Sequence, residues 1–370
     1  MAFDPQVPLA PRIQILENAI VVPFGAGKRS GVRRPGGVYT ADGVFVDDST
    51  CYRTSDLATI ARPKGKAPEP VEHLKGTHLY GGLLYQHFGH FLAESTGRFW
   101  ALNHVDMPVD GSVFLPKKKL TWPKRYARPL RGWLAHFDPV LANVQAPVEP
   151  VSVERLIIAP QGFGTNDMMW ACPEYRDYVH GHFAKDIPAA GAEKVYISRS
   201  KLFSKRGRYL AEERIEQLLM DEGYTIFHPQ AEPLEVQIAQ YKAATHIISS
   251  DSSALHLAAF FMGGEDQIAI VKRRPGRIFE DFLWQFESFT GKRPAVIDAL
   301  NGAAYRFEGT GEGQTSELFT ELDLRALGAE LGALGFVSAP SKWRNPTAKA
   351  LAEERAEWAA RAERALEPVV

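Results

Sequence analysis

The chain has 370 residues and a mass of 41.1 kDa, a length typical of about two domains. Its composition, 45% hydrophobic and 24% charged, is that of a globular protein with a core, which excludes a disordered tail and a disulfide-stabilised scaffold. With 43 basic and 44 acidic side chains the net charge is −1, so we expect no nucleic-acid partner.

The cysteine usage and the N-terminal residues bear on the cellular compartment of the protein. Cys51 and Cys172 are too few for a disulfide framework and form no CxxC pair. Residues 1–16 contain three prolines and no long apolar run, unlike a signal peptide. No stretch approaches the ~20 apolar residues of a membrane span. We therefore expect a cytoplasmic protein whose contact with a membrane, if it has one, is peripheral.

The first 150 residues contain short β-type runs between glycine turns, and we expect strands over 13–22 and 38–46. A helix is expected over 88–104, where apolar residues dominate. The segment 112–131 is basic and carries interleaved tryptophan and tyrosine side chains. Such a segment could contact an anionic glycan or a membrane surface. A solvated charged loop is the alternative.

From residue 151 onward the pattern alternates regularly between short apolar strands and helices. Strands that are apolar on both faces are typical of a parallel sheet covered by helices. The sequence therefore predicts an α/β fold with an N-terminal domain over 1–150, a C-terminal domain over 151–340 and a C-terminal helix over 341–370. The expected strands are 153–159, 194–198, 225–228, 246–249 and 267–271, and the expected helices are 173–186, 210–222, 233–243, 253–262 and 342–366.

Three ionisable residues, His90, Glu94 and Arg98, recur at intervals of four and would form one polar stripe on a helix. Their neighbours are apolar, so the groups must pair or change their pKa. Either His90 or Glu94 could then act as a general base. A network that only anchors the helix has the same spacing. His87, His90 and Glu94 also have the chemistry of metal ligands, although they lack the spacing of a known helical zinc motif.

A cationic loop follows the strand that is expected to end at Ser198, and it carries Arg199, Lys205 and Arg206. In an open α/β sheet, ligands bind beyond the carboxyl ends of the strands. Arginine at such a place binds phosphate oxygens through two parallel hydrogen bonds. These residues are candidates for a phosphate site, and a solvated basic loop is the alternative.

Another apolar strand, expected to end at Ser249, runs into a turn of small, mostly hydroxyl-bearing residues and then directly into a helix. The turn contains Ser250, Asp251, Ser252 and Ser253. The free N–H groups of a helix N-terminus bind phosphate, and small side chains allow it to approach. Helix capping by the same residues is an equal explanation. His256, one turn into the helix, would face the same ligand.

The sequence lacks the common glycine-rich phosphate-binding motifs and the nucleophile elbow of the hydrolases. The sequence contains no GxxxxGK[ST] loop and no GxGxxG after a strand, which argues against a P-loop ATPase and a dinucleotide-dependent dehydrogenase. It also has no GxSxG elbow.

Taken together, these segments resemble bacterial members of glycosyltransferase family 61. Residues 85–98 resemble the family's aromatic–Gly–His–x–x–x–acid–x–x–x–Arg helix, with Glu94 followed by Ser-Thr where many members have Asp followed by Leu-Pro. Residues 195–199 resemble its Tyr-Ile-Ser-Arg strand end. Where the family often has His-Gly-Ala-Gly-Leu, this chain has Asp251 in the histidine position, followed by Ser-Ser-Ala. That turn is also similar to the donor-side turn of heptosyltransferases.

The resemblance implies the GT-B fold, in which two Rossmann-like domains face a cleft. It implies an inverting, metal-independent transfer from a nucleotide sugar to a glycan or lipid-linked acceptor in surface or capsular polysaccharide synthesis, without a cofactor. The N-terminal domain would hold the acceptor and the base, His90 or Glu94. The C-terminal domain would hold the donor. The residues expected to contact the donor are Arg98, Ser198, Arg199, Lys205, Arg206, Ser250, Asp251, Ser252, Ser253 and His256.

Three alternatives remain open. A hydrolase or epimerase of the same architecture would act on a nucleotide sugar without an acceptor. The altered turn after Ser250 is compatible with a catalytically inactive or partner-dependent subunit. A metal-dependent enzyme would use His87, His90 and Glu94.

Overall fold

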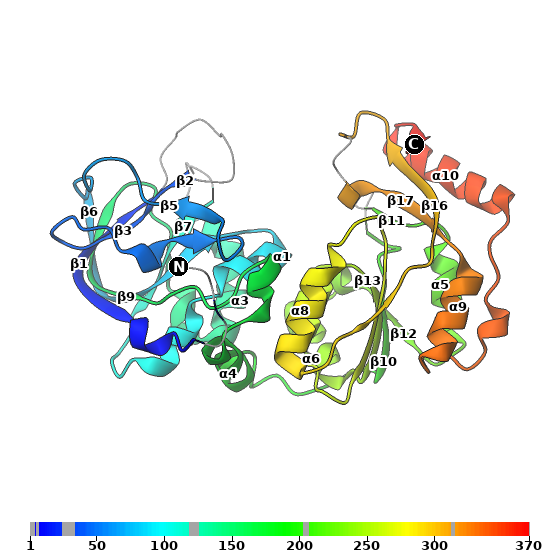
Figure 1. Ribbon diagram of the computed structural model, residues 1–370, viewed down its shortest axis with the longest axis horizontal. Coiled ribbons are helices and arrows are strands. Elements are labelled where there is room, and N and C mark those ends of the chain that lie inside the picture. Colours follow the sequence, from blue (N-terminus) through cyan, green and yellow to red (C-terminus); the bar gives the residue numbers. More distant parts are fainter. Residues whose placement is uncertain are drawn as a thin grey trace. The chain divides into compact units, whose positions relative to one another are not determined.

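The computed structural model describes residues 4, 7–23, 34–117, 126–202, 207–311 and 315–369. The chain divides into two compact units (Figure 1). The first contains Met1–Ile187 with Glu287–Phe289, and the second contains Pro188–Phe286 with Thr290–Val370. Among the residues that the structure describes, none of the helices combines the length and apolarity needed to cross a membrane.

The first unit is built on a mixed sheet with the strand order β3-β1-β9-β6-β7-β8. β6 pairs in parallel with β7 and β9, whereas β1 runs antiparallel to β9 and β3. A small second sheet has the order β2-β5-β4. The strands are β1 (Gln14–Val22), β2 (Arg34–Pro35), β3 (Gly37–Tyr39), β4 (Cys51–Tyr52), β5 (Ala58–Ala61), β6 (Glu72–Leu84), β7 (Gly111–Pro116), β8 (Val144–Gln145) and β9 (Val151–Ile158).

The helices of the first unit are short. They are η1 (Ala10–Arg12), η2 (Asp47–Ser49), α1 (Phe88–His90), η3 (Phe91–Ser95), η4 (Phe99–His104), η5 (Arg128–Leu130), α3 (Arg131–Phe137), η6 (Pro139–Ala142), η7 (Asn166–Trp170) and α4 (Pro173–His182). The helix expected over 88–104 is in fact three pieces: one α turn, the π-helical turn η3 and the 3₁₀ helix η4. The π turn ends at Ser95, so the side chains beyond it leave the expected stripe.

The second unit contains a fully parallel sheet with the order β12-β10-β13-β14-β15. Its strands are β10 (Lys194–Ile197), β12 (Thr225–Phe227), β13 (His246–Ser250), β14 (Gln267–Val271) and β15 (Ala295–Ile297). Helices cover both sides, with α6 and α8 on one side and α5 and α9 on the other (Figure 1). They are α5 (Glu212–Met220), α6 (Leu234–Ala243), α7 (Ala254–Ala258), α8 (Phe279–Thr290) and α9 (Leu324–Ala333). The expected parallel α/β arrangement is confirmed here.

A second sheet in this unit has the order β11-β17-β16-β18. Its strands are β11 (Arg208–Tyr209), β16 (Leu300–Phe307), β17 (Phe319–Leu322) and β18 (Leu366–Pro368). The remaining elements are η8 (Pro229–Ala231), η9 (Thr315–Glu317), η10 (Pro340–Lys342) and α10 (Ala348–Ala362). The helix expected over 342–366 is therefore present but shorter. The chain beyond it forms the strand β18 in place of the expected last turn. Leu351 and Trp358 of α10, with Leu366 of β18, pack on Leu210, Phe307 and Phe319.

Two features differ from the expected organisation. The expected boundary lies at residue 150, whereas the first unit continues to Ile187, because β9 pairs with both β1 and β6. The sheet of the first unit is mixed, with the antiparallel strands β1 and β3, and so differs from the all-parallel sheet of a Rossmann-like domain.

Candidate functional site

In the first unit, polar side chains gather where β6 ends and the π turn begins. His90 Nδ1 lies 2.6 Å from Glu94 Oε1, and the Tyr85 hydroxyl donates to Glu94 Oε2 at 3.0 Å. Both carboxylate oxygens therefore have partners. The Glu94 side chain is 4% exposed, whereas that of His90 is 37% exposed. The acid is buried and holds a histidine that reaches solvent.

This geometry fixes the role of each imidazole nitrogen. Because the Glu94 carboxylate accepts from Nδ1, the proton of a neutral His90 belongs on Nδ1, and Nε2 is the basic nitrogen. A carboxylate that orients an imidazole in this way also stabilises the imidazolium formed when Nε2 takes a proton. The His90–Glu94 pair has the form of a general base with its orienting acid.

Aromatic and cationic groups surround the pair. The Tyr85 ring stacks on His90 at 5.3 Å between centroids, and His87 meets His90 edge-on at 5.2 Å. Lys117 Nζ lies 4.5 Å from the centroid of the Tyr85 ring. Burial and the charge of Glu94 raise the pKa of Tyr85. The phenol therefore keeps its proton and remains a donor to Glu94.

Arg98, the third member of the expected stripe, serves a different purpose. It is 1% exposed and donates to the carbonyls of Asp48, Thr50 and Ala159 at 2.7–3.2 Å. Among the described residues, no ion pair joins Arg98 to Glu94. The break after the π turn carries Arg98 away from Glu94 and into the core of the first unit. A donor contact by Arg98 stays a prediction with no support from this geometry.

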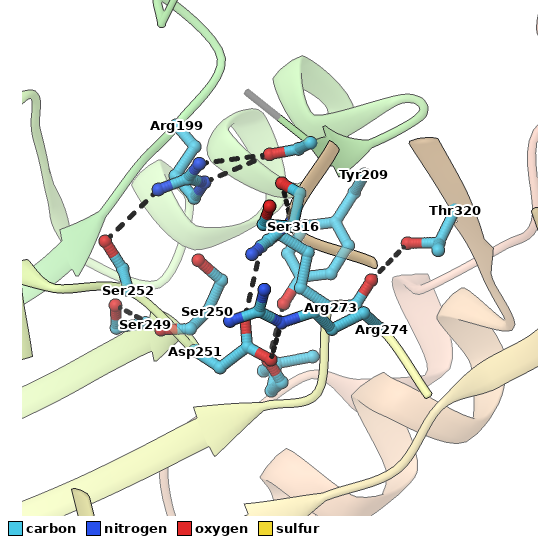
Figure 2. Close-up of polar contacts among 12 residues, drawn as sticks. Arg199, Tyr209, Ser249, Ser250, Asp251, Ser252, Arg273, Arg274, Ser316 and Thr320 are labelled. Atoms are coloured by element: carbon cyan, nitrogen blue, oxygen red, sulfur yellow. Dashed lines mark hydrogen bonds and ion pairs between the residues drawn. The ribbon is translucent and has the colours of Figure 1, made fainter. Parts of the chain in front are cut away.

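In the second unit, Arg199, Asp251 and Ser252 lie near one another at the C-terminal ends of two strands of the parallel sheet (Figure 2). After β10 the chain passes to β12 at the edge of the sheet, and then crosses to β13 on the opposite side of β10. The C-terminal ends of β10 and β13 thus form a topological switch point, the place where open α/β sheets bind ligands. Arg199 follows β10 and Asp251 follows β13, and both lie there.

Asp251 holds two arginines that the sequence analysis missed. Arg273 Nε donates to Asp251 Oδ1 at 3.1 Å, and Arg274 Nε donates to Oδ2 at 3.3 Å. Asp251 is 3% exposed. Arg273 and Arg274 follow β14 after one intervening lysine, so the signal that could have found them is a pair of arginines just beyond the strand next to the switch point. Asp251 is better described as orienting two arginines than as contacting a phosphate itself.

Arg199 completes the cluster from the other strand. Its Nη1 donates to Ser252 Oγ at 3.3 Å, and its Nε and Nη2 donate to the carbonyl of Gly207. Its backbone N–H donates to Glu212 Oε1 at 2.8 Å. Burial, together with the neighbouring charge of Arg273, lowers the pKa of Arg199 to about 9. An arriving anion would relieve both effects.

The remaining predicted donor residues divide into four groups. Ser250 Oγ is buried and has no hydrogen-bond partner among the described residues, so it is available to a ligand at the cluster. Ser198 Oγ bonds Glu216 at 2.5 Å, and His256 Nδ1 bonds Gln285 at 2.7 Å, so these two side chains face other partners. Ser253 precedes α7 without a side-chain capping bond. Lys205 and Arg206 lie outside the described residues.

The charges of the cluster favour an anion. Arg199, Arg273 and Arg274 converge on the switch point, and the carboxylate of Asp251 is shared between two of them. Helix α7 has only five residues, so its dipole adds little and the arginines supply most of the positive potential. Arginines held this way suit phosphate oxygens. In the described part of the chain, no three His, Cys, Asp or Glu side chains are placed to hold a metal ion.

Comparison with known proteins identifies one family. Residues 88–268 match the family model described as Glycosyltransferase 61. The match contains His90 and Glu94 of the first unit and Arg199 and Asp251 of the second, whereas Arg273, Arg274 and α10 follow it. No curated protein matches the chain.

Proposed function

Because the chain belongs to glycosyltransferase family 61, we propose that it moves a sugar from a nucleotide-sugar donor to a glycan or lipid-linked acceptor, with inversion at the anomeric carbon and without a metal ion. The observation that carries the donor half is the convergence of Arg199, Arg273 and Arg274 beyond β10, β13 and β14. The His90–Glu94 pair carries the acceptor half.

The donor diphosphate binds the arginine cluster of the second unit. As the bond between the anomeric carbon and the phosphate oxygen breaks, the electron pair stays on the diphosphate. The three guanidinium groups stabilise that charge, in the role that a metal ion has elsewhere. The buried hydroxyl of Ser250 gains the partner that it lacks by donating to a phosphate oxygen.

The acceptor hydroxyl attacks the anomeric carbon from the opposite side. His90 Nε2 takes its proton as the new C–O bond forms, and Glu94 stabilises the resulting imidazolium through Nδ1. One displacement with one base inverts the anomeric configuration. The proposed mechanism therefore needs a single general base in the first unit, and His90, oriented by Glu94, has that role.

We further propose that the reaction serves surface or capsular polysaccharide synthesis in the cytoplasm, at the inner membrane. The resemblance to bacterial members of the family supports this setting. The basic segment 112–131 supports a peripheral contact, and its residues 118–125 lie outside the described part of the chain.

Calorimetric titration with UDP, GDP, ADP, TDP and CMP in EDTA tests the donor half. We expect one nucleotide to bind, and Arg199→Ala to weaken it by about 1–3 kcal/mol, the scale of a charge-assisted hydrogen bond. Arg277→Ala is the matched control, because Arg277 is an exposed arginine of the same unit whose partner is Glu280. Equal affinities of the wild type and Arg199→Ala would remove Arg199 from the site. Binding that requires a divalent cation would contradict the metal-independent mechanism.

Release of nucleoside diphosphate from the matching nucleotide sugar tests the acceptor half. We expect release to depend on a glycan or lipid-linked acceptor, and His90→Ala to abolish it while nucleotide affinity persists. Release without an acceptor would indicate a hydrolase. Binding without turnover on any acceptor would favour an inactive or partner-dependent subunit.

A further inference from the structure

The C-terminal helix α10 lies outside the family match, yet it contacts Arg208 and Ala211 in the segment that leads from β10 to α5. Arg208 links the helix to this segment. This side chain is 2% exposed, and its guanidinium lies 3.6 Å from the centroid of the Trp358 ring on α10. A desolvated cation over a tryptophan face is among the stronger contacts of this kind.

From beneath that ring, Arg208 reaches the strand end. Its Nη1 donates to the carbonyl of Ser200 at 2.7 Å, and its Nη2 donates to the carbonyl of Leu202. Both carbonyls lie within three residues of Arg199. Arg208 is also adjacent to Gly207, whose carbonyl accepts two hydrogen bonds from the Arg199 side chain. One buried arginine thus connects the helix to both backbone segments around Arg199.

A carboxylate on the same helix reinforces the link. Glu354 Oε2 accepts from the backbone N–H of Ala211 at 2.6 Å, and Glu354 Oε1 lies 3.4 Å from Trp358 Nε1. Ala211 has a φ of +59°, a conformation that a residue with a side chain rarely adopts. Arg355 Nη1 bonds Glu321 Oε1 at 2.9 Å and fastens the helix to β17. The helix therefore holds the end of β11 as well as the side chain of Arg208.

Three observations exclude a merely peripheral helix. Trp358 packs on the buried cluster of Leu210, Phe307 and Phe319. Burial lowers the pKa of Arg208 to about 10, which shows that the charged guanidinium is partly desolvated beneath the Trp358 ring. The Nε of Arg208 has no hydrogen-bond partner among the described residues, so the rings of Trp358 and Phe319 and the two carbonyls hold the guanidinium in place.

We propose that Trp358 and Arg208 are positioning residues for the donor site, through which α10 holds the backbone around Arg199 in the conformation that binds a diphosphate. The inference rests on the proposed donor site in the second unit. It assigns a role in substrate binding to a helix that carries none of the predicted site residues.

The test measures binding of inorganic pyrophosphate to the full chain by calorimetry, because this probe contacts the arginine cluster without requiring the correct nucleobase. We expect Trp358→Ala and Arg208→Lys each to raise the dissociation constant about tenfold, equivalent to about 1.4 kcal/mol. Arg208→Lys keeps the charge but loses the planar fork that reaches two carbonyls. Trp358→Phe keeps a ring over the guanidinium and should restore affinity to within about threefold of the wild type.

Leu351→Ala is the matched control, since Leu351 packs on the same apolar cluster from the same helix and its loss leaves the ring above Arg208 in place. It should lower the melting temperature while pyrophosphate affinity stays within about twofold. Folded Trp358→Ala or Arg208→Lys protein with wild-type affinity would overturn the proposal. If Trp358→Ala does not fold, Arg208→Lys and Trp358→Phe decide the question.

Hydrogen exchange on ligand-free protein separates this proposal from the proposed function. We expect the amides of 199–202 and 207–211 to exchange about tenfold faster in Arg208→Lys than in the wild type or in Leu351→Ala. Unchanged exchange at these amides would overturn the positioning role. Faster exchange in a chain whose wild type binds neither pyrophosphate nor any nucleotide would retain the structural link and refute the donor site.

Discussion

Arg98 carries a positive charge in the core of the first unit, where backbone carbonyls are its main partners. Its guanidinium also lies 5.4 Å from the centroid of the Tyr80 ring. Arg98→Lys should cost about 2–4 kcal/mol of unfolding free energy, because carbonyls lose their donors and the remaining charge stays buried. Chemical denaturation measures this, with Arg155→Ala as the control, an exposed arginine paired with Glu17. A loss of nucleotide affinity without a loss of stability would restore Arg98 to the donor site.

Tyr85 is the second hydrogen-bond partner of the carboxylate that orients the proposed base. In Tyr85→Phe, Glu94 loses one hydrogen-bond donor, so its carboxylate attracts the imidazolium proton of His90 more strongly. The acidic limb of the pH profile of kcat/KM should then move to higher pH, by up to about one unit, since a hydrogen bond to a charged group is worth that much. Tyr80→Phe removes a buried hydroxyl of β6, the strand that precedes Tyr85, which donates to the Ser49 carbonyl, and should leave the limb unchanged. A limb at the same pH in both variants would show that Tyr85 only packs.

For single residues, the sequence predicted where the side chains lie better than it predicted which groups they bond. Spacing alone placed His90 against Glu94, and strand ends placed Arg199 near Ser252, because both arguments depend only on local geometry. Arg273 and Arg274 were not predicted as site residues, because only the order of strands in the sheet shows that the end of β14 lies next to the switch point. The carboxylate of Asp251 accepts hydrogen bonds from Arg273 and Arg274, and its expected contact with the ligand stays a prediction.

Among the elements, the π turn η3 has the largest effect on the site. A regular helix over 88–104 would place Arg98 beside Glu94, and the sequence gives no signal for the wider turn that separates them. Wider turns of this kind recur at functional sites. Helix α7 also departs from the expectation, because a helix expected over ten residues ends after five. Both departures reflect tertiary packing that overrides local periodicity.

The pairing of β11 with β17 depends on one glycine. A Cβ on Gly207 would collide with the Leu318 carbonyl and lie 2.5 Å from Arg273 Nη1. We expect Gly207→Ala to separate the two strands, to cost about 1–3 kcal/mol of stability and to weaken nucleotide binding, since the Gly207 carbonyl also anchors Arg199. Gly311→Ala, where a Cβ meets nothing within 4 Å, is the control for thermal denaturation and calorimetry. A Gly207→Ala protein as stable as the wild type would show that β11 can move without cost.

Over the whole molecule, the α/β class and the parallel sheet of the second unit followed from the alternation of strands and helices. The mixed sheet of the first unit did not, because β1 and β9 are separated by more than 120 residues and sequence periodicity carries no information on such pairing. The same pairing explains why the first unit extends past residue 150.

Three histidines make stability depend on pH in both units. Burial lowers the pKa of His78 and His180 in the first unit and of His228 in the second from the ordinary value of 6.5. Below pH 6.5 these histidines therefore take up protons more readily in the unfolded chain than in the native one. The free energy of unfolding falls as the pH falls from 6.5 toward the native pKa values, and this contribution is fully present above pH 6.5.

Melting temperatures between pH 5 and pH 8 measure this effect. We expect His78→Gln to make the decline below about pH 6.5 shallower, because one proton fewer distinguishes the two states. His104→Gln, on the surface, is the control. A decline of the same slope in wild type and His78→Gln would assign the pH dependence to other groups.

The pairing of β11 with β17 also has a consequence for biosynthesis. Arg199 leaves the ribosome long before Thr320, whose hydroxyl holds the Arg273 carbonyl and whose strand β17 closes the sheet around the cluster. At ordinary rates of translation that interval lasts on the order of ten seconds. During this time β11 has no β17 to pair with, and the Arg273 carbonyl lacks its hydrogen bond from Thr320. Under the proposed function, the donor site of the nascent chain is complete only once this long-range pairing has formed.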